Sequence, residues 1–389
     1  MDALSRRTAL LGAAGVVGAA MTGCTDSNAA PGTGATSSAA VPTTAAPSPS
    51  PSVSVDTTPR WPLTGRPLDD PADAERIVVA VKVPDSRNEH PQIGIDKADI
   101  VYVQMDGYPA AVGQSGTRLV PVFHSSYADS VNPVRSIRPV DIPMLSPMTA
   151  IIGSTGAYPW VLEYVEEFGQ YLIGRQDYMA SKGTGAYGIL GSRVRTLNGQ
   201  TYYDRAVVCY PDKLADLAKK FEQGPQQHYF PWAANADEVS TAVAGRAAAS
   251  LSVPWKSGNT YNMTYTYDAK TKRYLRSEPW GPHVLANGKR VSCDNVLVIR
   301  ATQIFGKVYA SGRIKTDGAI HKEPIHKIIN STGTFYYANR GKYVKGTWTK
   351  GEVNEVFQFT LDDGTPLRMA PGQTFVELPN LKAKVAVKG

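Results

Sequence analysis

Residues 77–83 read Ile-Val-Val-Ala-Val-Lys-Val, a nearly continuous run of β-branched side chains. Such a run predicts a strand that is buried on both faces. Residues 100–103 and 119–123 have the same character and are expected to be its companions. Residues 159–169 begin with a proline and end with a glycine, and residues 212–223 carry an apolar stripe, so both are predicted to be helices. This part of the chain is therefore predicted to be mixed α/β.

The pattern changes to a period of two from about residue 254. Residues 261–267 alternate tyrosine or methionine with asparagine or threonine, which is typical of a half-buried strand. Turn sequences at 287–288, 339–341 and 362–364 predict hairpins. The accompanying strands are expected around residues 296–299, 335–337 and 356–359. We therefore expect an α+β protein, with a mixed α/β domain over 61–235 followed by a β-rich domain over 250–385.

The N-terminal segment has the parts of an export signal. Residues 5–10, Ser-Arg-Arg-Thr-Ala-Leu, resemble a twin-arginine motif, and the apolar run that follows is 13 residues long, against about 20 needed to cross a bilayer. Thr22 and Gly23 are small and directly precede Cys24, as signal peptidase for lipoproteins requires. Residues 1–23 are therefore predicted to be a twin-arginine-type lipoprotein signal peptide, with a palmitate-bearing lipid anchor on Cys24.

Residues 24–60 are predicted to be a disordered tether. They consist almost entirely of Ala, Pro, Ser, Thr and Gly, which offer little apolar surface to bury. The remaining body carries the net charge of +7, spread along the chain instead of packed into a basic run. This distribution suits anionic lipid or wall polymers better than nucleic acid. The expected location is the extracytoplasmic face of the cell membrane.

The cysteines of the body, Cys209 and Cys293, leave two alternatives open. A disulfide between them is allowed outside the cell, and two buried free thiols are equally compatible with the sequence. The sequence contains no Cys-x-x-Cys pair and no cluster of cysteine with histidine. No metal site and no cofactor are therefore predicted.

A stiff arginine-containing loop is the first candidate binding site. Arg135 and Arg138 lie between Pro133 and Pro139, which restrict the backbone, and two guanidinium groups can hold a phosphate or carboxylate. Asp141 could orient one of them. The alternative is an internal ion-pair network with Asp141 or Asp99 that fastens the loop to the sheet.

His124 follows a predicted strand, at a position where α/β sheets often present ligand-binding groups. A catalytic role would require a nearby nucleophile and carboxylate, whereas a lone histidine is more often structural. Residues 183–188 match Gly-x-Gly-x-x-Gly without the strand and helix that a nucleotide site needs, so a loop is expected there. Tyr261, Tyr265 and Tyr267 could stack on sugars, but cross-strand packing explains their spacing equally well.

Several short stretches together resemble the YerB-type lipoprotein family, which is built on the domain of unknown function numbered 3048. They cover the body from about residue 62 to 380. The stretches are 62–68, 95–102 and 132–139 in the first half, and 274–277, 346–348 and 371–375 in the second. The resemblance implies an extracytoplasmic lipoprotein in two parts, and this family has no agreed activity to transfer.

We therefore expect a non-enzymatic, membrane-anchored module that binds an anionic cell-envelope ligand or a partner protein. The alternative is a hydrolase or transferase that modifies the cell wall. Its carboxylate-based site would lie between the two domains and use Asp99, Asp106, Asp141 or His124.

Overall fold

The structure is a computed structural model that describes residues 58–107, 116–218, 221, 224–226, 228–255, 261–319 and 321–389. The predicted signal peptide, Cys24 and most of the predicted tether lie outside the described residues. Arg60 was expected to belong to the tether, but it forms a β-bridge with Pro67, and its guanidinium group donates to the carbonyls of Gly65 and Ala234. The ordered body thus includes the last residues of that predicted segment.

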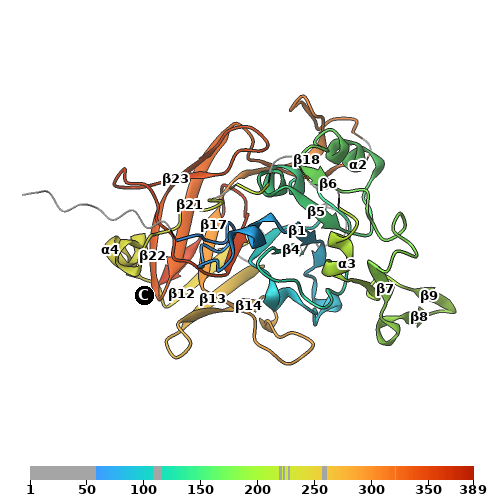
Figure 1. The fold of residues 1–389 in the computed structure, drawn as a ribbon, viewed down its shortest axis with the longest axis horizontal. Coiled ribbons are helices and arrows are strands. Elements are labelled where there is room, and N and C mark those ends of the chain that lie inside the picture. The colour runs from blue at the N-terminus through green and yellow to red at the C-terminus, as the bar shows by residue number, and fades with distance from the viewer. Residues whose placement is uncertain are drawn as a thin grey trace, which may run out of the picture. The chain divides into compact units, whose positions relative to one another are not determined.

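The run at residues 77–83 forms β1 (Val78–Val81), an inner strand of a large mixed sheet (Figure 1). β1 pairs antiparallel with β4 (Thr117–Phe123) and parallel with β5 (Ala150–Gly153). All its side chains are buried, as the continuous apolar run predicted. Lys82 interrupts the run, and the chain then continues as β2 (Val83–Pro84), which pairs with β4.

Strands from both halves of the sequence share this sheet. β3 (Ile100–Met105) pairs antiparallel with β4 on one side and parallel with β24 (Thr374–Glu377) on the other. Beyond β24 the sheet continues through β17 (Asn295–Ile299), β21 (Ser331–Asn339), β22 (Lys342–Lys350) and β11 (Arg246–Ala247). β23 (Gln358–Leu361) also pairs with β22. At the other end, the sheet ends beyond β5 with β6 (Leu172–Ile173). The two predicted domains are therefore segments of sequence that build one continuous sheet.

A second antiparallel sheet is formed by the tyrosine-rich part of the chain. Its strands, in order, are β15 (Gly281–Pro282), β14 (Arg273–Glu278), β13 (Asn262–Asp268), β12 (Ser250–Pro254) and β25 (Ala386–Lys388), and β16 (Ser292–Cys293) also pairs with β14. Met263 and Tyr265 of β13 are fully buried, which confirms the alternation expected over 261–267. Tyr265 is therefore used for packing and is closed to sugars.

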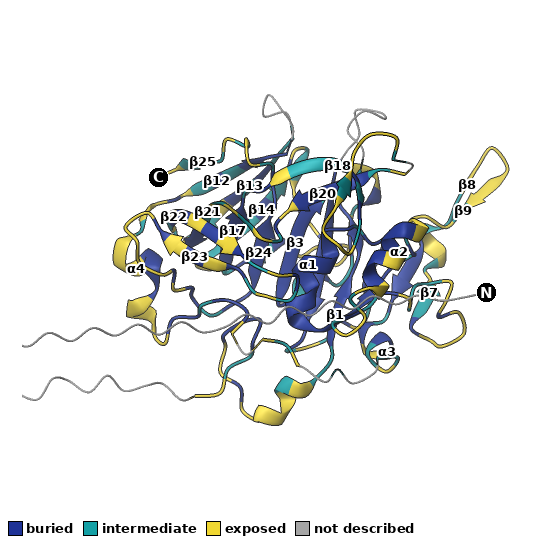
Figure 2. Ribbon diagram, turned by 90° about the horizontal axis from the view of Figure 1, so that it is seen from above, coloured by how far each residue is buried: buried dark blue, intermediate teal, exposed yellow. Residues whose placement is uncertain are grey.

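The remaining elements are short. The helices are α1 (Asp141–Leu145), α2 (Pro159–Glu166), α3 (Pro211–Ala215) and α4 (Ser240–Ala244), and the 3₁₀ turns are η1 (Pro71–Glu75), η2 (Arg87–Glu89), η3 (Ile95–Lys97), η4 (Ser146–Met148), η5 (Gly191–Arg193) and η6 (Ala236–Glu238). The smaller strand groups are β19 (Ile314–Lys315), β18 (Thr302–Val308) and β20 (Glu323–Lys327), then β7 (Tyr187–Ile189) with β10 (Val207–Cys209), and β8 (Arg195–Leu197) with β9 (Gln200–Tyr202). Figure 2 shows the exposed hairpin β8–β9 and the buried interior of the main sheet.

The predicted α+β fold class is confirmed, with differences in the lengths of individual elements. Of the helix expected over 212–223, residues 219–220 and 222–223 lie outside the described residues. The described part contains α3, after which the chain tightens into bonds such as Leu217 N–H to Leu214 O. The turn predicted at 339–341 is confirmed, with Arg340 and Gly341 both at positive φ. None of the helices in the described residues is both long enough and apolar enough to span a bilayer.

Candidate functional site

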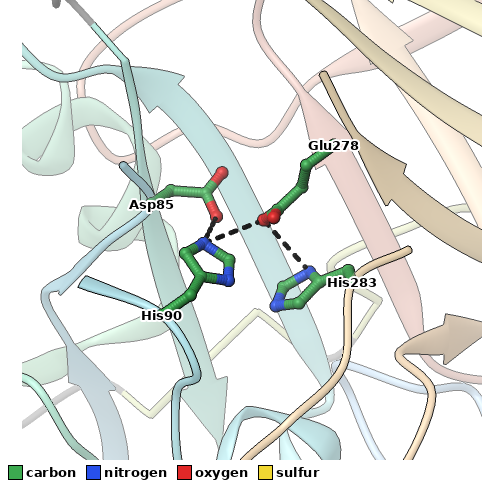
Figure 3. A group of neighbouring side chains, drawn as sticks. All are labelled: Asp85, His90, Glu278 and His283. Atoms are coloured by element: carbon green, nitrogen blue, oxygen red, sulfur yellow. Dashed lines mark ion pairs between the residues drawn. The ribbon is translucent and has the colours of Figure 1, made fainter. Parts of the chain in front are cut away.

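A buried group of ionisable side chains lies where the segment after β2 meets the second sheet. Asp85 follows β2 and His90 ends the η2 turn, whereas Glu278 is the last residue of β14 and His283 follows β15. One ligand atom of each residue lies within 4.8 Å of those of the others (Figure 3). These four residues, called the Asp85 cluster below, are the described residues that could hold a metal ion.

Arg276 of β14 lies beside the Asp85 cluster and supplies a positive charge. Its Nη2 is 2.7 Å from Asp85 Oδ2 and its Nη1 is 2.9 Å from Glu278 Oε1, and none of the three side chains is exposed. Nη1 also donates to His283 Nδ1 at 2.6 Å. The neutral imidazole of His283 in turn donates from Nε2 to Gln92 Oε1 at 2.9 Å.

The pKa values of the four residues in the Asp85 cluster are shifted in different directions. Burial acts to raise the pKa of Asp85, but Arg276 and His90 outweigh it and hold that pKa well below its usual range. Burial and the charge of Asp85 raise the pKa of Glu278 to about 7. Burial acts to lower the pKa of His90, but hydrogen bonds to Asp85 and Glu278 raise it to about 9. Burial and Arg276 lower the pKa of His283.

The arginines of the predicted loop are held by internal carboxylates. Arg135 contacts Glu89 and lies 3.6 Å from Asp204. Arg138 lies 3.1 Å from Glu323 and 3.3 Å from Asp106. The ion-pair alternative therefore describes the positions of these side chains, although the partners are neither Asp99 nor Asp141.

Asp141 is a buried partner of a lysine. Its Oδ1 lies 2.6 Å from Lys82 Nζ and accepts from Gln104 Nε2 at 3.0 Å. Its Oδ2 accepts from the backbone N–H of Arg138 at 2.6 Å, so it does orient the arginine loop, through the main chain. Burial lowers the pKa of Lys82 to about 8 despite the neighbouring carboxylate.

Asp99 and His124 lie together at the end of β4, where the carboxylate of Asp99 holds the backbone of His124. Asp99 Oδ2 accepts from the backbone N–H groups of His124 and Ser125, at 2.7 Å each. The ring of His124 donates from Nε2 to the carbonyl of Ala74 at 3.1 Å and packs edge-on against Trp61. Burial lowers the pKa of His124 to about 4. The structure thus brings these two candidates together, away from Arg135 and Arg138.

Cys209 and Cys293 are free, buried thiols, so the disulfide alternative is not formed. Cys209 ends β10, which pairs with β7, whereas Cys293 lies in β16 on the second sheet. The two strands belong to different sheets.

A basic cavity lies on another part of the body. It has a volume of about 530 Å³ and is lined by residues near α4, by the β13–β14 turn with Lys272, and by the β21–β22 turn with Arg340 and Lys342. Asp294 also lines it, but this carboxylate is neutralised by Arg273 at 2.6 Å and Arg66 at 3.0 Å. Within the described residues, Lys272, Arg340 and Lys342 have no ion pair. This set, the basic cavity, combines open volume with uncompensated positive charge.

Sequence reasoning missed Lys82, Arg276 and Glu278. A signal was available for each. Lys82 is a charge inside an apolar run, and in β14 the period of two places Arg276 and Glu278 on the buried face with Tyr274. Charges on a buried face require partners, so such positions point to ionic clusters.

Comparisons with known proteins agree with this architecture. Residues 63–205 match the family described as "Protein of unknown function (DUF3048) N-terminal domain", and residues 251–376 match its C-terminal domain. The chain is 26% identical over 339 residues to the Bacillus subtilis protein named "Putative lipoprotein YerB", covering 84% of this chain and 88% of that protein. The crystal structure of YerB from Bacillus subtilis has a TM-score of 0.61 at 21% identity, over 84% of this chain and 99% of that one, so the fold is shared. The chain belongs to the DUF3048 family of proteins of unknown function.

Proposed function

We propose that this protein is an exported lipoprotein, anchored through Cys24 on the extracytoplasmic face of the cell membrane, whose body binds a phosphate- or carboxylate-bearing polymer of the cell envelope. The twin-arginine motif, the short apolar run and Cys24 support the anchor. The name of the Bacillus subtilis relative, which describes a lipoprotein, supports it as well.

The basic cavity is the observation that carries the binding role. Its volume of about 530 Å³ falls within the range of about 300–1,000 Å³ that is usual for small-ligand sites. Lys272, Arg340 and Lys342 are exposed, so an incoming anion meets cations that no internal carboxylate of the described residues occupies. Arg135 and Arg138 would first have to release Glu89, Asp204, Asp106 and Glu323, so we place the anion site at the basic cavity.

The backbone of the cavity supports this assignment. Lys272 has a φ of 57° and Arg340 a φ of 47°, in the left-handed region that side chains other than glycine and asparagine seldom adopt. Two long cations are thus presented at the tips of tight hairpin turns, on rigid strands. Strained positions of this kind are frequent at binding sites.

The test compares binding of a glycerol phosphate oligomer to the wild type and to variants of the cavity. Lys272→Asn and Arg340→Asn remove charge while keeping a residue that tolerates positive φ, and Lys342→Gln completes the set. Lys327→Gln, an exposed lysine at the end of β20, is the matched control. An exposed ion pair contributes about 0.2–1 kcal/mol, so each cavity variant should weaken binding about one-and-a-half- to five-fold, and the triple variant between about three-fold and about 100-fold.

Two further arms identify the source of the anion. Vesicles that contain an anionic phospholipid at equal phosphate concentration distinguish a lipid headgroup from a wall polymer. A neutral glycan oligomer of equal length should not bind. Binding should also weaken as salt is raised, because these charges are exposed. Absence of binding to both phosphate probes, or equal loss in Lys327→Gln and the cavity variants, would contradict the proposal.

A further inference from the structure

We propose that Asp85, His90 and Glu278 form a binding site for a divalent transition-metal ion, with Zn²⁺ as the best match. His90 Nε2 lies 3.3 Å from Asp85 Oδ1 and 3.0 Å from Glu278 Oε1. Ligands that bind one zinc ion tetrahedrally at about 2.0–2.1 Å lie about 3.3 Å from each other. The two carboxylate oxygens, from distant parts of the chain, thus already lie at the distance from His90 Nε2 that separates neighbouring ligands of a single ion.

The neighbours of His90 Nε2 include both a hydrogen-bond donor and two acceptors, which one nitrogen atom cannot satisfy together. Gln92 is fixed, because its Nε2 donates to the carbonyl of Pro84 at 3.0 Å and its Oε1 accepts from His283 at 2.9 Å. Its amide N–H therefore faces His90 Nε2 at 3.0 Å. If His90 Nε2 carries a proton, this N–H group faces the N–H group of Gln92, and two donors meet. If Nε2 carries a lone pair, the lone pair faces the carboxylates of Asp85 and Glu278, and acceptors meet. A cation held between the lone pair and the two carboxylates removes the conflict.

Glu278 provides an independent indication. Its side chain is fully buried, and its Oε2 has no hydrogen-bond partner in the part of the chain that the structure describes. The other oxygen of this carboxylate, Oε1, lies 3.0 Å from His90 Nε2 and 3.5 Å from His283 Nδ1. Enclosed carboxylate oxygens normally have partners, so the unpaired Oε2 indicates that this carboxylate can still take a ligand. Figure 3 shows the carboxylate of Glu278 directed towards the rings of His90 and His283.

The charges around the Asp85 cluster favour a divalent ion. The buried carboxylates of Asp85, Glu278 and Glu377 all act on the single guanidinium group of Arg276. Three carboxylates thus face one guanidinium group, so a cation bound at His90 Nε2 would meet an excess of carboxylate groups. Arg290, the other nearby cation, is only half-buried and donates to the backbone carbonyls of Arg276 and His283.

The chemistry of the ligands selects the class of ion. An imidazole with two carboxylates suits Zn²⁺, whereas Mg²⁺ and Ca²⁺ prefer oxygen ligands alone. Arg276 and Thr117 hold the outer oxygen of Asp85 at 2.7 and 2.6 Å and would orient it from behind. The side chain of His90 is 12% exposed, whereas those of Asp85 and Glu278 are not exposed, so His90 is the proposed ligand in contact with solvent.

The experiment uses the purified protein after removal of metals with a chelator. Thermal unfolding is followed while Zn²⁺ or Mg²⁺ is added, and zinc affinity is measured by competition with a fluorescent zinc indicator. The test variant is His90→Gln, and the matched control is His326→Gln, since His326 is a buried histidine whose Nε2 contacts the amide of Gln303. We expect Zn²⁺ but not Mg²⁺ to raise the Tm by several degrees, and His90→Gln to weaken zinc binding at least about 100-fold while His326→Gln leaves it unchanged.

X-ray absorption at the zinc edge of the wild type keeps the test decisive if His90→Gln does not fold. The proposal requires nitrogen and oxygen ligands with the contribution of one imidazole and no sulfur. A Tm that does not respond to Zn²⁺, equal zinc affinity in His90→Gln and the wild type, or sulfur in the ligand shell would each overturn the metal site.

Discussion

Replacement of Lys82 by methionine should destabilise the protein far more than removal of both members of its ion pair. Lys82 and Asp141 are 0% and 1% exposed and lie 2.6 Å apart. Lys82→Met preserves the packed volume but leaves the carboxylate of Asp141 with only Gln104 and a backbone N–H, and loss of one partner of a buried pair costs about 3–5 kcal/mol.

The pKa of Lys82 shows why a double variant that removes both charges should regain most of the stability lost in Lys82→Met. Burial lowers this pKa from 10.5 to about 8, so even beside Asp141 folding shifts the balance between charged and neutral lysine by about 3 kcal/mol against the charged form, relative to lysine in water. Removing both charges with Lys82→Met/Asp141→Asn therefore removes that penalty as well. We expect the double variant to lie within about 1–2 kcal/mol of the wild type, because neutral replacement of a buried pair is often close to neutral in stability.

Urea unfolding followed by tryptophan fluorescence measures these differences as shifts of the midpoint. The double-mutant cycle should give a coupling energy of about 2 kcal/mol or more. A single variant that costs less than about 1 kcal/mol, or a double variant whose cost equals the sum of the two single ones, would refute the reasoning.

Three further predictions concern the rest of the body. Burial lowers the pKa of His124 from 6.5 to about 4, so as the pH falls the unfolded state takes up this proton before the folded state does. The stability contributed by His124 is therefore lost as the pH falls from 6.5 towards 4. His124→Gln should flatten that part of a plot of unfolding free energy in urea against pH, and an unchanged slope would contradict the assignment. Cys209 and Cys293 are free thiols, so a reductant should leave the Tm unchanged, and a fall of several degrees would indicate a disulfide. Trp348 is fully buried and donates to the carbonyl of Arg300, so Trp348→Ala should cost about 3–5 kcal/mol in urea unfolding, and a cost below about 1 kcal/mol would show that the site is not packed.

Local sequence patterns predicted the strands and the fold class well. The β-branched run at 77–83 and the alternation at 261–267 each give one strand its buried face without help from distant residues. The sharing of one sheet by both halves was not predictable in this way. It depends on β24 pairing with β3, and nothing within either strand specifies the other as its neighbour.

The candidate sites were harder to predict from the sequence, because the residues that form each site come from distant segments of the chain. The loop with Arg135 and Arg138 was predicted from the sequence as a candidate anion site or an internal ion-pair network, but the carboxylates that hold it come from separate segments and were not identified. Asp85 and Arg276 lie 191 residues apart and meet only when the second sheet packs against the chain after β2. Residue type and spacing identify charges that need partners, and the tertiary fold decides which partners they obtain.

The mass of the mature N-terminal peptide, taken from the membrane fraction of cells that produce the protein, tests the proposed anchor most directly. We predict a peptide that begins at Cys24 and carries fatty acyl chains, because Thr22 and Gly23 lead into that cysteine. A soluble chain from the cell interior that still begins at Met1, with Cys24 unmodified, would contradict a lipoprotein of the cell envelope.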